Sequence, residues 1–172
     1  MSVVLHALID ELRKTKRTAE RAFGQLEDED FFFRLNPRQN SIYVIVKHLS
    51  GNMLSRWTDF LTSDGEKPGR DRESEFVEEL VPRERIMELW EKGWAAVFAA
   101  LEPLGDADLT RTVTIRGEPH TVAMAAVRQV AHYAYHVGQI LLIAKHLRGE
   151  RWKYLTIPPG GSAEFNRKMG RA

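Results

Sequence analysis

The sequence predicts one all-α domain: a four-helix bundle with a small β-hairpin before its last helix and a C-terminal tail packed on the bundle. Four long segments repeat apolar side chains at spacings of three and four, the period of an amphipathic helix. One short stretch alternates with a period of two instead. A chain of 172 residues has the size of one domain, and helices with one apolar face bury it most simply against each other. We therefore expect residues 1–172 to form a single domain.

The first two helices are bounded by capping and turn residues. The first is expected from about Ser2, whose hydroxyl suits the N-cap, to Leu26. Pro37 lies in a loop of turn residues, and Ser41 then suits the N-cap of the second helix. Because the link between the two helices is short, we expect them to be antiparallel neighbours.

The connection to the third helix is unusually long for a small domain. Residues 63–81 are rich in charge and contain helix breakers such as Gly65 and Pro68. Such a connection is either a lid or a disordered segment, and it leaves room for the chain to cross the bundle. Pro82 then suits the first turn of the third helix, which is expected to end near Pro103.

The last third of the chain combines a hairpin, a helix and a tail. The stretch Leu109–Val122 alternates with a period of two around a central glycine, which predicts a β-hairpin. The fourth helix is expected from about Ala123 to Leu147, with Gly149 as its stop. The remaining segment is rich in proline and glycine and is expected to pack across the bundle as a tail. Its expected anchors are Trp152, Tyr154, Leu155 and Ile157.

Composition narrows the class of function. The chain has no cysteine, so a disulfide framework and a thiolate zinc site are excluded, and a metal would need histidine or carboxylate ligands. Lysine and arginine number 25 against 24 aspartates and glutamates, a balance that disfavours a nucleic-acid partner. No apolar run approaches the roughly 18 residues of a membrane span. We expect a cytoplasmic protein with neither a membrane nor a nucleic-acid partner.

Two histidines in the fourth helix, His132 and His136, suggest a metal site. Residues four positions apart on a helix differ in direction by only about 40° and in height by roughly 6 Å, so both rings project from one face. Gln139 continues the same stripe three residues later. The spacing fits either two ligands of a metal ion or two hydrogen-bonded histidines of the core, and by itself leaves both interpretations open.

A metal ion at this pair would need a third ligand from another helix, and His48 is the candidate. It lies in the apolar run of the second helix, and Asn52 follows it on the same face. Gln139 and Asn52 are placed to contact a bound water or a substrate, and Tyr135 to line a pocket. Simple packing or solvent exposure remains the alternative for each. We do not expect the other histidines to be ligands: His6, His120 and His146.

These motifs occur in an order that resembles the DinB/YfiT-like superfamily, whose members are regarded as metalloenzymes. The similarity rests on KHLSGN in the second helix, the RTVTIRGEPHTV hairpin, and HYAYHVGQ in the last helix. It covers nearly the whole chain and is strongest to one bacterial branch. The resemblance implies a four-helix bundle, often a homodimer, in which His48, His132 and His136 hold one divalent metal ion per chain.

Three neutral imidazoles leave a metal ion its full charge and an open coordination position. Some members of the superfamily use low-molecular-weight thiols, so the resemblance implies a small-molecule substrate and a thiol-dependent S-transferase or isomerase, with a hydrolase close behind. The alternative is a non-catalytic, stress-associated metal-binding protein. Imidazole ligands suit zinc and nickel equally, so the sequence does not choose between them. Asp59 and Glu102 are weak candidates for a general base.

Overall fold

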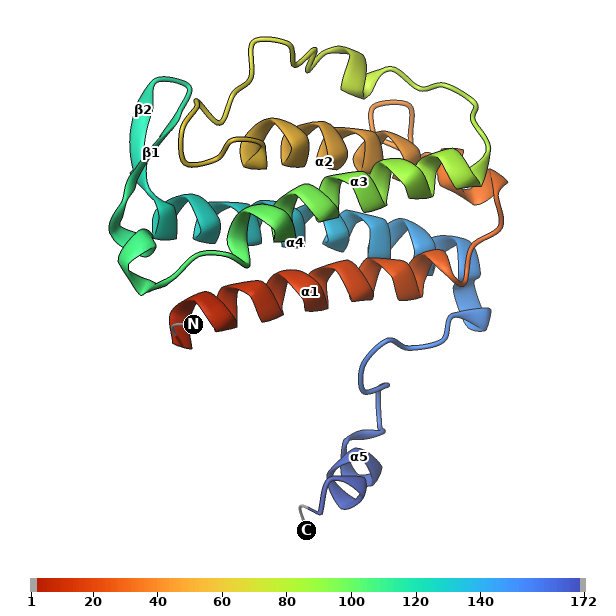
Figure 1. Cartoon of the computed structure of the whole chain (residues 1–172). Coiled ribbons are helices and arrows are strands. Elements are labelled where there is room, and N and C mark those ends of the chain that lie inside the picture. Colours follow the sequence, from red (N-terminus) through yellow and green to blue (C-terminus); the bar gives the residue numbers. More distant parts are fainter. Residues whose placement is uncertain (1–2, 171–172) are drawn as a thin grey trace.

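Four long helices form a bundle in the computed structural model, which describes residues 3–170 (Figure 1). A short helix, α5 (Ser162–Lys168), lies beyond the bundle. The expected fold class, an all-α bundle with a small hairpin before the last long helix, is confirmed. The bundle helices are α1 (Val3–Phe23), α2 (Ile42–Trp57), α3 (Arg83–Leu101) and α4 (Val122–Arg148).

The helices do not simply alternate in direction along the bundle. In Figure 1, α1 and α4 run one way and α2 and α3 run the other way. The closely packed pairs are α2 with α3 and α1 with α4. The connection for which the sequence left room for a crossover does cross the bundle: residues 58–82 return along α2, so that α3 starts at the same end as α2. The expectation that α1 and α2 pack as neighbours is wrong: they are antiparallel, but each packs mainly on another helix.

The helix ends follow from local capping. The Ser41 hydroxyl accepts a hydrogen bond from the Val44 amide at 3.3 Å and starts α2, as expected. Thr121 caps α4 in the same way. Gly149 has φ of 51°, a left-handed value that favours glycine, and ends α4 as expected. The cap predicted at Ser2 lies outside the described residues.

Aromatic side chains fill the centre of the bundle and fix how α2 faces α4. Trp90 packs edge-on against Phe23 with ring centroids 5.2 Å apart, and Trp94 packs similarly on Tyr133. The indole of Trp57 on α2 donates a hydrogen bond to the Tyr133 hydroxyl on α4 at 2.9 Å. Because Tyr133 is fully buried, this bond fixes the rotation of α4 and turns its neighbouring histidines toward α2.

The 63–81 segment is ordered and covers α2, so the alternative of a disordered connection is wrong. A short 3-10 helix within it, η2 (Ser74–Phe76), packs on α2. The Ser55 hydroxyl of α2 donates to the Gly65 carbonyl and accepts from the Lys67 amide, at 3.0 and 2.9 Å. The segment is thereby tied to the helix that carries His48.

The hairpin consists of β1 (Thr112–Ile115) and β2 (Glu118–Thr121), which pair antiparallel as expected. Its two turn residues, Arg116 and Gly117, have positive φ values of 55° and 76°, as in a tight two-residue turn. The Asp64 carboxylate accepts both of their amides at 2.8 Å. The turn is therefore held against the crossover segment, and the base of the hairpin leads directly into α4.

Among the tail residues that the structure describes, up to residue 170, the first ones pack on the bundle. Trp152 is 9% exposed. The side-chain amide of Gln25 donates a hydrogen bond to the Lys153 carbonyl and accepts one from the Lys153 backbone N–H. Tyr154 and Ile157, expected as anchors, are 50% and 40% exposed. Figure 1 shows α5 projecting away from the bundle. Across residues 3–170, none of the helices has the length and apolar character needed to cross a bilayer.

Candidate metal centre

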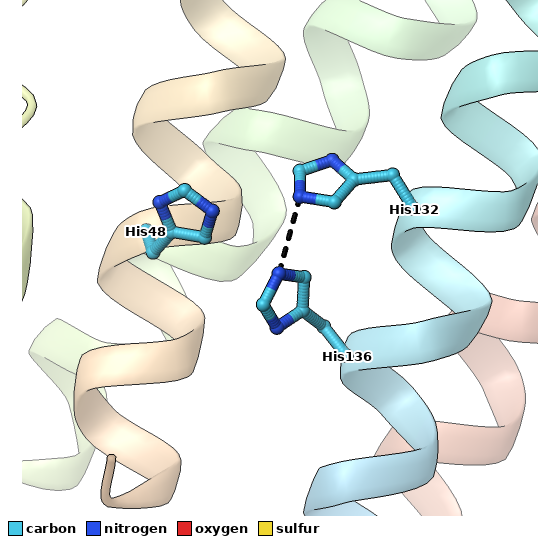
Figure 2. A group of neighbouring side chains, drawn as sticks. All are labelled: His48, His132 and His136. Atoms are coloured by element: carbon cyan, nitrogen blue, oxygen red, sulfur yellow. Dashed lines mark hydrogen bonds between the residues drawn. The ribbon is translucent and has the colours of Figure 1, made fainter. Parts of the chain in front are cut away.

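Three histidines converge between α2 and α4 (Figure 2). His48 projects from α2, and His132 and His136 project from successive turns of α4, as their spacing predicts. One ring nitrogen of each lies within 4.8 Å of the others. No carboxylate joins this group among residues 3–170. The structure thus brings together the three side chains that the sequence singled out as ligands.

Both histidines of α4 are oriented by glutamine side chains of the same helix. Nδ1 of His136 lies 2.9 Å from Oε1 of Gln139, and Nδ1 of His132 lies 3.4 Å from Oε1 of Gln129. An amide oxygen only accepts hydrogen bonds, so each Nδ1 is the protonated nitrogen. Each Nε2 then keeps its lone pair, which is how neutral histidines bind metal ions.

A glutamate from the crossover segment orients His48 in the same way. Nδ1 of His48 lies 2.8 Å from Oε2 of Glu75, which itself is only 5% exposed. Arg70 holds the other side of this carboxylate in a bidentate pair, with N···O distances of 2.7 and 2.9 Å. Burial acts to raise the pKa of Glu75, but the hydrogen bonds from His48 and Arg70 outweigh it and lower the pKa. Glu75 is therefore an anion that fixes the His48 ring.

The separation of the ring nitrogens fits a shared metal ion. Nε2 of His132 and Nε2 of His136 are 3.1 Å apart. With both protons on Nδ1, two lone pairs face each other at that distance, an arrangement that a cation between them stabilises. Two imidazoles bound tetrahedrally to zinc at about 2.0–2.1 Å have nitrogens roughly 3.3 Å apart. The residues present therefore fit a divalent metal ion.

The surroundings keep these rings in the neutral form that metal binding requires. Burial, together with the charges of the neighbouring His136 and His48, lowers the pKa of His132 to about 3. Burial also lowers the pKa of His136, against the opposing hydrogen bond with Gln139. Neither ring needs to lose a proton before it binds a metal ion at neutral pH.

The other residues expected near the site lie in different environments. Asn52 is buried beside His48, and its Oδ1 accepts a bond from the Tyr133 hydroxyl at 3.3 Å. Tyr135 contacts the His136 ring edge-on but is 65% exposed and is not among the residues that line the cavity beside His48 and His132. The two weak candidates for a general base are remote: Asp59 is exposed after the end of α2, and Glu102 pairs with Arg13.

Sequence reasoning missed two residues that orient the ligands. Gln129 precedes His132 by three residues, as Gln139 follows His136 by three, so the symmetry of the pattern was available in the sequence. Glu75 lies in a charged stretch without periodicity. The sequence feature that relates to its position is Gly51 within α2. A glycine inside a helix indicates close approach of another segment, and a Cβ at Gly51 would collide with the Glu75 carboxylate.

A cavity of about 340 Å³ opens beside His48 and His132. Asn52 and Gln129 form part of its wall. The rest is lined by arginines from four parts of the chain: Arg56, Arg70, Arg72, Arg116 and Arg128. None of the lining residues is an aspartate or a glutamate. The metal centre therefore borders a space that is strongly cationic, a property that overall composition did not predict.

A family model described as "Protein of unknown function (DUF1572)" matches residues 2–161. This range contains the bundle, the crossover segment and all three histidines of the centre. No curated protein is found to match the sequence.

Proposed function

We propose that this chain, which belongs to the DUF1572 family, is a metal-dependent enzyme acting on a small molecule at the three-histidine centre. The observation that carries the proposal is the convergence of three oriented imidazoles beside a cavity, with no carboxylate joining them among residues 3–170. Structural zinc sites are usually closed by four protein ligands, whereas catalytic sites keep a position open. This supports an enzyme over a protein that only binds or stores the metal ion.

Membership of the DinB/YfiT-like superfamily is part of the proposal. It is supported by the order of the elements: a helix with His48, a hairpin, and then a helix with His132 and His136. The parallel α2 and α3, joined by a long crossover, add a topology that a simple up-and-down bundle does not have.

In this mechanism the chain's own residues would hold the metal ion and orient its histidine ligands. Glu75, Gln129 and Gln139 hold the rings, and Asn52 offers a polar group to the cavity beside His48. A divalent ion, zinc or nickel at one per chain, would lower the pKa of a bound water or thiol. The crossover segment packs on α2, and His48 is only 6% exposed.

The cavity favours the thiol-dependent version of this activity. No carboxylate lines it, and the nearby Glu66 and Glu75 are both engaged by arginines, so the described residues provide no free general base there. A thiol loses its proton more easily than water and needs such a base least. Because the chain has no cysteine, the thiol would be a second small molecule. We therefore place S-transfer or isomerisation first and hydrolysis second.

The test is an assay of small electrophiles with metal-loaded and metal-stripped protein, each with and without a low-molecular-weight thiol. We expect turnover only when both metal and thiol are present. Metal-dependent turnover without thiol would select the hydrolase. A protein that binds metal but turns over nothing would favour the non-catalytic alternative. The control is His146→Ala, since His146 stacks on Phe33 away from the centre and its loss should leave turnover unchanged.

The homodimer implied by the resemblance is a further part of the proposal. Four large apolar residues of α4 fall on one side of the helix and are 56–65% exposed: Met124, Val127, Tyr135 and Leu142. A stripe of this kind supports association with a second chain. The cytoplasmic location and the absence of nucleic-acid and membrane partners stay predictions from the sequence.

Sedimentation tests the dimer. We expect the protein to sediment at about twice the mass of the 19.7 kDa chain, and Val127→Glu to shift it to the single-chain mass because the charge would be buried in the interface. Ile157→Glu, on the tail, is the matched control and should remain dimeric. A wild-type protein that sediments as a single chain would contradict the prediction.

A further inference from the structure

The arginine-lined cavity holds more positive charge than the fold requires. Five guanidinium groups line it, and four of them have a carboxylate partner. Those partners are Glu75 and Glu66 for Arg70, Glu66 also for Arg56 and Arg116, and Glu73 for Arg72. Three carboxylates thus face five cations. A charge imbalance beside a cavity indicates an anion that the chain does not itself provide.

Arg56 is the strongest indication of such an anion. It is only 4% exposed, and its Nε and Nη1 atoms have no hydrogen-bond partner among residues 3–170. Within the same residues its one carboxylate contact is Glu66 at 3.7 Å, and this carboxylate is shared with Arg70 and Arg116, both at 3.3 Å. A buried guanidinium with two unsatisfied donors is costly, so the donors are expected to meet a ligand.

Arg128 approaches the same space from α4. It precedes His132 by four residues, so it lies on the helix face that carries the histidines. It forms no ion pair within the part of the chain that the structure describes. Burial lowers the pKa of Arg56, the charge of Glu66 opposes this, and the charges of Arg70 and Arg128 lower the pKa further. Cations that line one cavity repel each other, and an anion bound between them relieves the repulsion.

We propose that the cavity binds an oxyanion group of the substrate, a carboxylate or a phosphate, with Arg56 and Arg128 as its principal ligands. The planar fork of an arginine matches the paired oxygens of either group. A cavity of about 340 Å³ has room for a small acid or phosphate ester, and His48 and His132 in its wall place the rest of the molecule at the metal centre. This anion site extends the proposed function. The identification of the anion as part of a substrate rests on that proposed function.

The experiment measures anion binding by calorimetry, with inorganic phosphate and succinate as probes, on both metal-loaded and metal-stripped protein. We expect one saturable site in both forms, and the tighter of the two probes identifies phosphate or carboxylate as the recognised group. Arg128→Gln should weaken binding by about ten- to a hundredfold, the usual effect of losing a charge-assisted contact. Arg17→Gln, an exposed arginine on α1, is the matched control and should bind like wild type.

Arg56→Lys is the second variant, because it keeps the buried charge but removes the fork, and circular dichroism verifies its fold. It should weaken binding in a folded protein. The inference is overturned if neither probe binds, if Arg128→Gln and Arg56→Lys bind like wild type, or if Arg17→Gln weakens binding as much as they do. Because the metal-stripped protein is also measured, anion binding without any turnover would contradict the proposed enzyme and leave the oxyanion site established.

Discussion

Replacing His132 with alanine is expected to lower the metal content of the purified protein from about one divalent ion per chain to less than about a tenth of that. Two imidazoles would remain as ligands. The positively charged arginines that line the cavity would then repel the metal ion, because three ligands no longer hold it. His48→Ala and His136→Ala should have the same effect. Elemental analysis after dialysis gives the stoichiometry directly.

The same variants change the stability of the fold in a defined way. Added metal should raise the free energy of unfolding of the wild-type chain by about 2.7 kcal/mol at a free concentration of 100 times the Kd. The three alanine variants should show no such rise. His146→Ala is the matched control on α4, far along the helix from the centre, and should keep both the metal and the rise. Retention of metal by any one alanine variant would remove that histidine from the centre.

The parts of the site that the sequence predicted are those with helical periodicity. His132, His136 and Gln139 share one face of one helix, and a spacing rule is enough to place them together. His48 required one further step, the choice of a second helix, which composition supported because the chain has no cysteine. Local capping was predictable for the same reason: Ser41 and Gly149 act on their own helices.

The parts that were missed depend on contacts between distant segments. The arginines of the cavity come from α2, the crossover segment, the hairpin turn and α4, and no spacing in the sequence relates them. The packing order of the helices was also missed, because the short link sets only the antiparallel direction of α1 and α2. Which helix each one packs against is decided by the aromatic core and by the long crossover.

Replacing Glu75 with glutamine is expected to destabilise the chain by about 3–5 kcal/mol. The Arg70 side chain is 5% exposed and would lose its bidentate carboxylate, leaving a buried charge without full compensation. Urea unfolding should show a lower midpoint with an unchanged m-value. Glu73→Gln is the matched control two residues away, where an 88% exposed carboxylate pairs with the exposed Arg72, and should change stability by less than about 0.5 kcal/mol.

Glu75 also holds the His48 ring, and a double variant separates this role from its role in stability. Glu75→Gln should weaken metal binding by about 10- to 100-fold, as loss of a carboxylate behind a histidine ligand usually does. Adding Arg70→Met removes the uncompensated buried charge, so part of the lost stability should return. Metal affinity should stay low in the double variant, because His48 still lacks its carboxylate. If affinity recovers together with stability, Glu75 acts on the metal centre only through the fold; if it does not, the carboxylate orients the ligand directly.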